Sequence, residues 1–140
     1  MFEKIIYSKS IFSIGLSNSK EVDNDGIVIA TKSSMKKSLD KINYDYALID
    51  SVDLMINKPY FNFNKADSIS VSVAAASIIA KVCRDSMMSN IYDKLYPDYF
   101  FKNNKGYGSI KHIEIMKNIG LCSIHRKTFK PNSELIRKWD

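Results

Sequence analysis

The chain has 140 residues, 45% of them hydrophobic and 26% charged, a composition typical of one globular domain. No apolar run approaches the ~20 residues of a transmembrane helix, so a membrane-spanning protein is not expected. The net charge of +6 fits a polyanionic partner, although solvated surface lysines would produce the same balance.

The first part of the chain predicts a helix, a strand, a turn and a second helix. Residues 2–9 are expected to end a helix, and residues 11–17 alternate apolar with small or polar side chains, as a strand does. Residues 17–25 are rich in Asn, Ser and Asp and predict a turn, in which Asp23 or Asn24 would cap the next helix. That helix has a stripe at three- and four-residue spacing, made of Val28, Thr31, Met35, Leu39 and Ile42.

The middle of the chain predicts an αβ unit followed by a long helix. Residues 46–50 form a short apolar run that ends in Asp50, which is typical of a buried, parallel strand. Residues 60–63 predict a second short strand. Ser70 or Ser72 is expected to cap a helix that reaches about Leu95, where Pro97 prevents its continuation.

The last part predicts a loop, a helix and a tail. Residues 100–108 contain two glycines and predict a loop, and residues 110–119 predict a helix with Gly120 as its C-cap. Residues 135–139 form an amphipathic end. The fold class is therefore α/β, with only two or three strands and a helical C-terminal part.

Two aspartates are candidates for chemistry. Asp50 closes a strand, where α/β folds place ligand-binding groups, but taken alone it is more typical of a residue that caps the loop that follows. Asp85 shares one helix stripe with Ser77 and Lys81, so Lys81 could pair with Asp85 or neutralise a phosphate. Small residues along this helix indicate burial, and a buried acid needs a partner or a metal ion.

A glycine loop and two histidines are further candidates. In the segment 105–109, two glycines flank Tyr107, whose ring could stack on a sugar or base, although an ordinary turn would look the same. His112 is expected to be packed or capping. His125 and Arg126 could contact a phosphate or form a structural clasp. No zinc-type spacing and no phosphate-loop or nucleophile-elbow motif occurs.

Cysteine usage predicts a reducing compartment. Cys83 and Cys122 show no CxxC spacing and are interpreted as thiols, and the N-terminus has no secretory signal pattern. We therefore expect a cytoplasmic protein.

Three ordered blocks resemble bacterial ribonuclease HII. They are KADSISVSVAAASIIAKVCRD at 65–85, YPDYFFKNNKGYGSIKH at 96–112, and the ending with Gly120, His125, Arg126 and Phe129. The resemblance covers nearly all 140 residues. It implies a ribonuclease H-like fold and hydrolysis of the RNA strand of RNA–DNA hybrids, including 5′ of single ribonucleotides in duplex DNA.

The resemblance also implies roles for individual residues. Family members bind Mn²⁺ or Mg²⁺ with four acids, and by position Asp50 is similar to the third and Asp85 to the fourth. Tyr107 is similar to the tyrosine that stacks on the sugar at the RNA–DNA junction, and Lys105 to a neighbouring phosphate contact. Arg126 and Lys81 are expected to contact substrate as well.

The chain departs from the family pattern at its start. The family opens with a strand of the form DEAGRG, which does not occur here, so residues 1–140 are expected to be the C-terminal two-thirds of a ribonuclease HII-like domain with an incomplete sheet. We expect no cleavage by this chain alone, and a separate N-terminal fragment of the same enzyme is a candidate partner. The alternative is a non-catalytic nucleic-acid-binding remnant. Smaller departures are Ala66 and Phe100 in place of Gly, Ser109 in place of Thr, and Ser51-Val52 in place of the Gly that follows the third acid.

Overall fold

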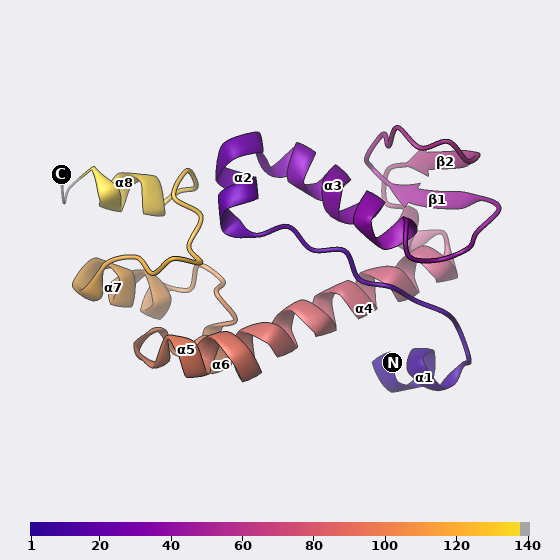
Figure 1. Ribbon diagram of the computed structural model, residues 1–140. Helices are drawn as coiled ribbons and strands as arrows, with labels where there is room; N and C mark the ends of the chain where they lie inside the picture. The colour runs from indigo at the N-terminus through magenta and orange to yellow at the C-terminus, as the bar shows by residue number, and fades with distance from the viewer. Residues whose placement is uncertain (138–140) are drawn as a thin grey trace. The chain divides into compact units, whose positions relative to one another are not determined.

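The computed structural model describes residues 1–137, which divide into two units (Figure 1). The first unit holds residues 1–17 and 25–82, and the second holds residues 18–24 and the chain from Cys83 onward. Each unit is described by itself. Trp139, in the predicted amphipathic end, lies outside the described residues.

The first unit contains a two-stranded sheet and several helices. Its elements are α1 (Phe2–Tyr7), α3 (Ile27–Leu39), β1 (Ala47–Asp50), β2 (Tyr60–Phe63), η1 (Ala66–Ser68) and most of α4 (Val71–Met87). β1 and β2 are parallel, with Ala47 opposite Tyr60 and Asp50 opposite Phe63, as the apolar run predicted. The α/β class is therefore confirmed, and within residues 1–137 the sheet has two strands.

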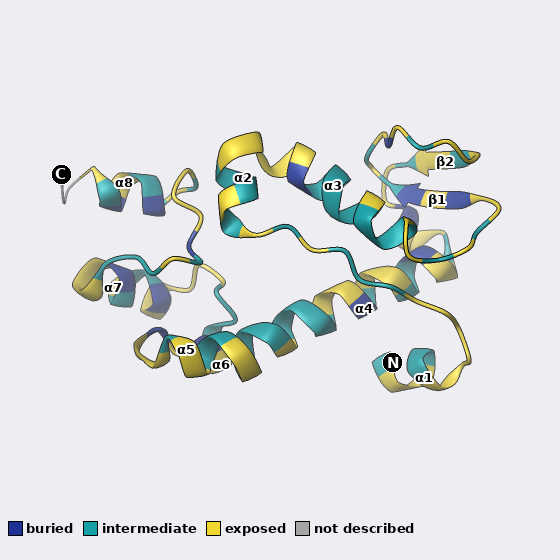
Figure 2. Cartoon of the chain, viewed as in Figure 1, coloured by how far each residue is buried: buried dark blue, intermediate teal, exposed yellow. Residues whose placement is uncertain are grey.

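Alternation along β1 builds the core of this unit. Ala47 and Ile49 are buried, whereas Leu48 between them is exposed, so one face of the sheet points into the protein (Figure 2). Leu54 completes the buried cluster, and Met35 and Leu39 of α3 pack against it. Two members of the predicted stripe thus face the core. Val28, by contrast, is 58% exposed, so the stripe does not include it.

The predicted strand at residues 11–17 is wrong. This extended segment lies along α3 and makes no ladder with a strand: the Ser13 hydroxyl donates to the Ser38 carbonyl at 2.5 Å, and the Ser17 hydroxyl to the Ala30 carbonyl at 3.0 Å. Gly15 lies between them, where a Cβ atom would stand 1.8 Å from the Ser34 carbonyl oxygen. The small residues that made the alternation look like a strand are used for close helix packing.

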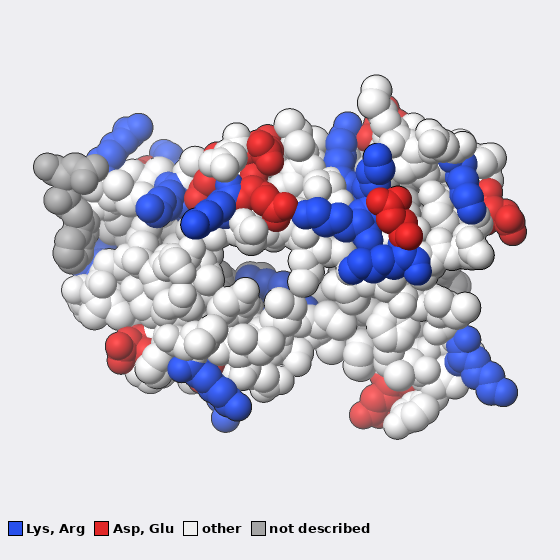
Figure 3. Space-filling model, viewed as in Figure 1, with Lys and Arg blue, Asp and Glu red and all other residues white. Residues whose placement is uncertain are grey.

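Lysines of α3 and just beyond it satisfy carbonyl groups of the same segment. Lys37 Nζ donates to the Leu16 carbonyl at 3.1 Å, and Lys41 Nζ to the Ile14 carbonyl at 2.8 Å. Figure 3 shows basic side chains gathered over the end of α3, with an acidic side chain beside them. Part of the positive charge of the chain therefore has a structural use.

The predicted turn at residues 17–25 is also wrong. These residues form α2 (Ser19–Asp25), because Asn18 and Glu21 make a reciprocal capping box: Asn18 Oδ1 accepts from the Glu21 N–H at 3.0 Å, and Glu21 Oε2 accepts from the Asn18 N–H at 2.7 Å. Neither Asp23 nor Asn24 caps α3, whose N-cap is Gly26. Asp23 instead accepts from the backbone N–H groups of Lys127 and Thr128.

The second unit is helical. α4 continues through a π-helical turn, η2 (Met88–Tyr92), into α5 (Asp93–Leu95), so the long helical run ends before Pro97 as predicted. The remaining elements are η3 (Pro97–Tyr99), α6 (Phe101–Asn104), α7 (Ile110–Ile119) and α8 (Asn132–Ile136). The predicted loop at 100–108 is thus helical over four residues.

The core of the second unit is built around aromatic side chains. The buried cluster is formed by Tyr99, Phe101, Met116 and Leu135. The predicted helix at 110–119 is confirmed: Ser109 Oγ accepts from the His112 N–H at its start, and Gly120, with φ of 81°, ends it. Ser109 therefore supplies a capping hydroxyl where the family pattern has Thr.

Candidate functional site

Asp50 is the last residue of β1 and belongs to the first unit. Its Oδ1 accepts from the Ala66 N–H at 3.0 Å and from the Ser51 hydroxyl at 2.9 Å. Ala66 is completely buried in η1, so the carboxylate links the end of the strand to the turn that leads into α4. These two contacts hold the side chain in place on a rigid element.

The backbone next to Asp50 is unusual. Ser51 has a φ of 60°, in the left-handed region that favours glycine. This is the position where the family pattern has Gly, so the departure noted in the sequence puts a serine in a glycine conformation. Its hydroxyl bond to Asp50 partly offsets that strain.

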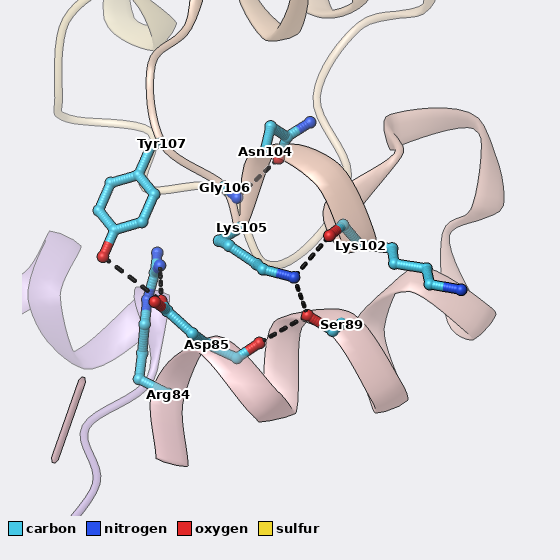
Figure 4. A network of polar contacts seen from close by, with 8 residues as sticks. All are labelled: Arg84, Asp85, Ser89, Lys102, Asn104, Lys105, Gly106 and Tyr107. Carbon is cyan, nitrogen blue, oxygen red and sulfur yellow. Dashed lines mark hydrogen bonds and ion pairs between the residues drawn. The ribbon is translucent and has the colours of Figure 1, made fainter. Parts of the chain in front are cut away.

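Asp85 lies on α4 in the second unit, one turn before the π-helical η2. Its Oδ1 accepts from Arg84 Nη1 at 3.0 Å and from the Tyr107 hydroxyl at 3.3 Å (Figure 4). The Asp85 side chain is 22% exposed. Lys81 precedes Asp85 by one helical turn and is exposed. Asp85 is thus hydrogen-bonded to Tyr107, in the glycine-containing segment 105–109.

Tyr107 brings an aromatic face to this acid. The Arg84 guanidinium lies over its ring, 4.5 Å from the ring centroid. Tyr107 is 49% exposed, so half of the residue remains open to solvent. Arg84, Asp85 and Tyr107 therefore form a closed triangle of contacts.

The backbone of the loop is held by its own residues. Lys105 and Gly106 both have positive φ values, of 52° and 71°. Asn104 supports this conformation, because its Oδ1 accepts from the Gly106 N–H and its amide nitrogen donates to the Tyr99 carbonyl, both at 2.7 Å. The position of Tyr107 is thus set by a preorganised turn.

Lys105 points back toward α4. Its Nζ donates to the Ser89 hydroxyl and to the Lys102 carbonyl, and the Ser89 hydroxyl in turn donates to the Asp85 carbonyl at 2.8 Å (Figure 4). Ser89 belongs to η2, and π-helical turns often occur beside functional sites. The lysine expected to contact substrate therefore also connects the loop to the turn that follows Asp85.

The histidines are structural, as expected for His112. His112 and His125 are 2% and 8% exposed, and their Nε2 atoms lie 3.3 Å apart. Burial lowers the pKa of His112, and burial together with the neighbouring His112 lowers the pKa of His125 to about 4. His125 Nδ1 accepts from the Cys122 N–H, and burial raises the pKa of the Cys122 thiol.

Arg126 is exposed, and its guanidinium lies 4.2 Å from the centroid of the Phe129 ring. Its carbonyl accepts from the Asn132 side chain at 2.9 Å. The backbone of Arg126 thus clasps the tail, which agrees with one of the two alternatives, while its charged end remains at the surface.

The carboxylates are the donor type that Mg²⁺ and Mn²⁺ prefer, but they are few. Among residues 1–137, no group of three or more His, Cys, Asp or Glu side chains is placed to hold a metal ion. Asp50 belongs to the first unit and Asp85 to the second. The donor chemistry fits such an ion, whereas the number of ligands within either unit falls short.

An acid at the end of a strand, and a second acid held beside an arginine and an exposed tyrosine, are side chains that a nuclease could use on a phosphodiester. The sequence model of Ribonuclease HII matches residues 3–132. The chain belongs to the ribonuclease HII family of endonucleases, and the resemblance found in the sequence is confirmed.

Curated bacterial relatives agree with this. The chain is 40% identical over 138 residues to Ribonuclease HII of Enterococcus faecalis, covering 97% of this chain and 54% of that protein. It is 42% identical over 136 residues to Ribonuclease HII of Listeria innocua, covering 96% and 52%. It is 39% identical over 140 residues to Ribonuclease HII of Acholeplasma laidlawii, covering 99% of this chain and 68% of that protein. The chain therefore spans about half the length of the first two relatives.

Sequence reasoning missed three residues at the Asp85 site. Arg84, Ser89 and Asn104 were not among the candidates that the sequence provided. Asn104 precedes two left-handed residues, and an Asn before Lys-Gly is a recognisable turn signal. For Ser89 the sequence offers no signal, because its role depends on the π-helical turn.

Proposed function

We propose that this chain contributes to an endonuclease that cleaves the RNA strand of RNA–DNA hybrids, including 5′ of single ribonucleotides in duplex DNA. Asp50 and Asp85 are the proposed ligands of a Mn²⁺ or Mg²⁺ ion. Tyr107, Lys105, Arg126 and Lys81 are the proposed substrate contacts. The observation that carries the proposal is the contact between Tyr107 and Asp85, supported by membership of the ribonuclease HII family.

This contact places a ribose-sized aromatic surface beside an acid. A ring that stacks on a sugar next to an acid-bound cation would put the scissile phosphate near that cation. Because the 2′-hydroxyl distinguishes RNA from DNA, a tyrosine at this position is suited to select a ribonucleotide. The half-exposed ring of Tyr107 supports this assignment.

The ion would supply an activated water and charge stabilisation at the phosphate when bound. The residues of this chain hold and orient their groups in advance. Asp50 is fixed by the Ala66 N–H, and Asp85 by Arg84 and Tyr107. The exposed Arg126 and Lys81 add positive charge that attracts a phosphate backbone without reading its sequence.

Hydrolysis is proposed to require more than these two acids. Asp50 and Asp85 alone would bind a divalent ion weakly, since they are two of the four acids that the family resemblance implies. We propose that a segment bearing the family's Asp-Glu and Gly-Arg-Gly strand, as a separate fragment or as part of the same protein, completes the site. A chain without it would bind nucleic acid without cleaving it.

The location proposed for this activity is the cytoplasm. Cys83 and Cys122 are free thiols in the structure, which supports a reducing environment. No helix among the described residues is long and apolar enough to cross a bilayer.

Product mapping tests the proposed reaction. The chain is mixed with an N-terminal segment from a relative, such as the enzyme of Enterococcus faecalis, and given a labelled DNA duplex containing one ribonucleotide plus Mn²⁺. The expected product ends in a 3′-hydroxyl on the 5′ side of the ribonucleotide, and an all-DNA duplex stays intact. Equal cutting of both duplexes, or cuts at other positions, would contradict the proposed specificity.

A further inference from the structure

Arg84 has no assigned role, yet it contacts both functional groups of the Asp85 site. Its guanidinium donates to Asp85 Oδ1 at 3.0 Å and covers one face of the Tyr107 ring at 4.5 Å. We infer that Arg84 is a positioning residue that fixes the Tyr107 ring and thereby sets the preference for a ribonucleotide. This inference rests on the proposed function.

The contacts constrain the ring at two points. The Tyr107 hydroxyl donates to the same Asp85 oxygen that Arg84 binds, so the tip of the side chain is held. The guanidinium lies against the face, so rotation of the ring about its axis is hindered. A tyrosine side chain has two rotatable torsions, and these two contacts fix both.

The turn that leads to Tyr107 lies against Arg84 at Gly106. A Cβ atom at Gly106 would lie 3.6 Å from Arg84 Nη2 and 3.0 Å from Met88 Cε. The 3.6 Å distance is an ordinary van der Waals contact, so it is the left-handed φ of 71° at Gly106 that favours glycine in this turn. Asn104 holds the same glycine through its N–H. The tyrosine side of the stack is thus held by the turn, while the Arg84 side chain, 41% exposed, is held by Asp85.

Arg84 covers one face of the Tyr107 ring, so a ligand could stack on the opposite face. A sugar or base stacked there would form a sandwich, with the cation drawing electron density from the side away from the ligand. Lysine cannot replace arginine in this role, because its ammonium is a point charge without a planar surface. Arg84→Lys therefore separates positioning from charge.

Binding measurements on the full chain test the inference. Fluorescence anisotropy in EDTA, where no cleavage occurs, gives the Kd for a DNA duplex with one ribonucleotide and for the same duplex of DNA alone. Arg84→Ala is expected to lower the preference for the ribonucleotide duplex about two- to fivefold, the effect of one exposed cation–ring contact. Arg84→Lys is expected to retain the affinity for the DNA duplex but to lose most of the preference.

Lys111→Ala is the matched control. Lys111 also lies over an aromatic ring, 5.9 Å from the Phe100 centroid, and its loss removes one positive charge. This variant should weaken both complexes equally and keep their ratio. An unchanged ratio in both Arg84 variants, with circular dichroism showing that they fold, would overturn the inference.

A second readout needs no nucleic acid. In the free chain, NMR signals of the Arg84 side chain should be shifted upfield by the Tyr107 ring current, and Tyr107→Leu should abolish the shift. No shift would overturn the stack itself. Failure of the proposed function looks different: the wild-type chain would show no preference between the duplexes, even with the ring-current shift present. Such a result would also overturn the specificity role of Arg84.

Discussion

The Tyr107 hydroxyl donates to Oδ1 of Asp85 at 3.3 Å, which joins a loop tyrosine to an acid 22 residues earlier on α4. Both residues lie in the second unit, whose aromatic core supports the loop. The ring and the acid are therefore already in contact before any ligand binds.

Removing the ring should matter more than removing the hydroxyl. Tyr107→Ala is expected to weaken binding of the ribonucleotide duplex by about 1–3 kcal/mol, the contribution of one stacked ring. Tyr107→Phe keeps the ring and should lose ~1 kcal/mol or less. Anisotropy titrations of both variants provide the measurement, and equal losses would show that the ring does not stack.

Gly15→Ala should destabilise the first unit. The new Cβ would stand 1.8 Å from the Ser34 carbonyl oxygen, a backbone atom that can move only with α3. We expect a loss of about 1–3 kcal/mol or more in urea unfolding, as overpacking usually costs. Gly108→Ala is the control, because nothing lies within 4 Å of its added Cβ. Equal stability of the two variants would show that residues 11–17 do not pack on α3 as described.

These packing details mark the limit of sequence reasoning. The parallel strands, the helix of residues 110–119 and the break at Pro97 were predictable, since apolar runs and caps are local signals. The segment at 11–17 was not, because alternation of small and apolar residues suits both a strand and a strap against a helix. The Asn18–Glu21 capping box was readable in principle and was overlooked.

The site was predictable only in part. Asp85 and Tyr107 were identified from the sequence, and the structure brings them together. The roles of Arg84 and Ser89 depend on helix phase and on the π-helical turn, which residue types alone do not reveal.

Phe100→Gly should stabilise the chain. Phe100 has a φ of 53°, where glycine is favoured, and its side chain is half-exposed. Relief of the strain is expected to add ~1 kcal/mol, less the lost contact with Lys111. Phe61→Gly, at an exposed position of β2, is the control and should destabilise. The measurement is the Tm of both variants in thermal unfolding. A lower Tm for Phe100→Gly than for the wild type would contradict the proposed backbone strain at Phe100.

Acid should destabilise the second unit through its buried histidines. Burial and His112 lower the pKa of His125 to about 4 from 6.5, so the folded state disfavours the proton. The part of the free energy of unfolding that depends on an uncharged His125 is fully present above pH 6.5. It is lost as the pH falls from 6.5 toward 4. This group alone accounts for at most about 3 kcal/mol. The pKa of His112 is lowered too, which acts in the same direction.

Urea unfolding at pH 7, 5.5 and 4.5 measures this dependence. His125→Gln retains an acceptor for the Cys122 N–H but does not titrate, so its stability should fall less over the same range. Parallel pH profiles for the variant and the wild type would show that the buried histidines are not responsible.

Cleavage by acid variants tests the central proposal most directly. The chain and the N-terminal segment of a relative are mixed with Mn²⁺ and a duplex carrying one ribonucleotide, using wild type, Asp50→Asn, Asp85→Asn and the exposed control Asp45→Asn. The wild type and the Asp45 variant are expected to cut only when the segment is present, and the other two variants to lose activity at least a hundredfold. Robust cleavage by the chain alone, or by either the Asp50 or the Asp85 variant, would contradict the proposal.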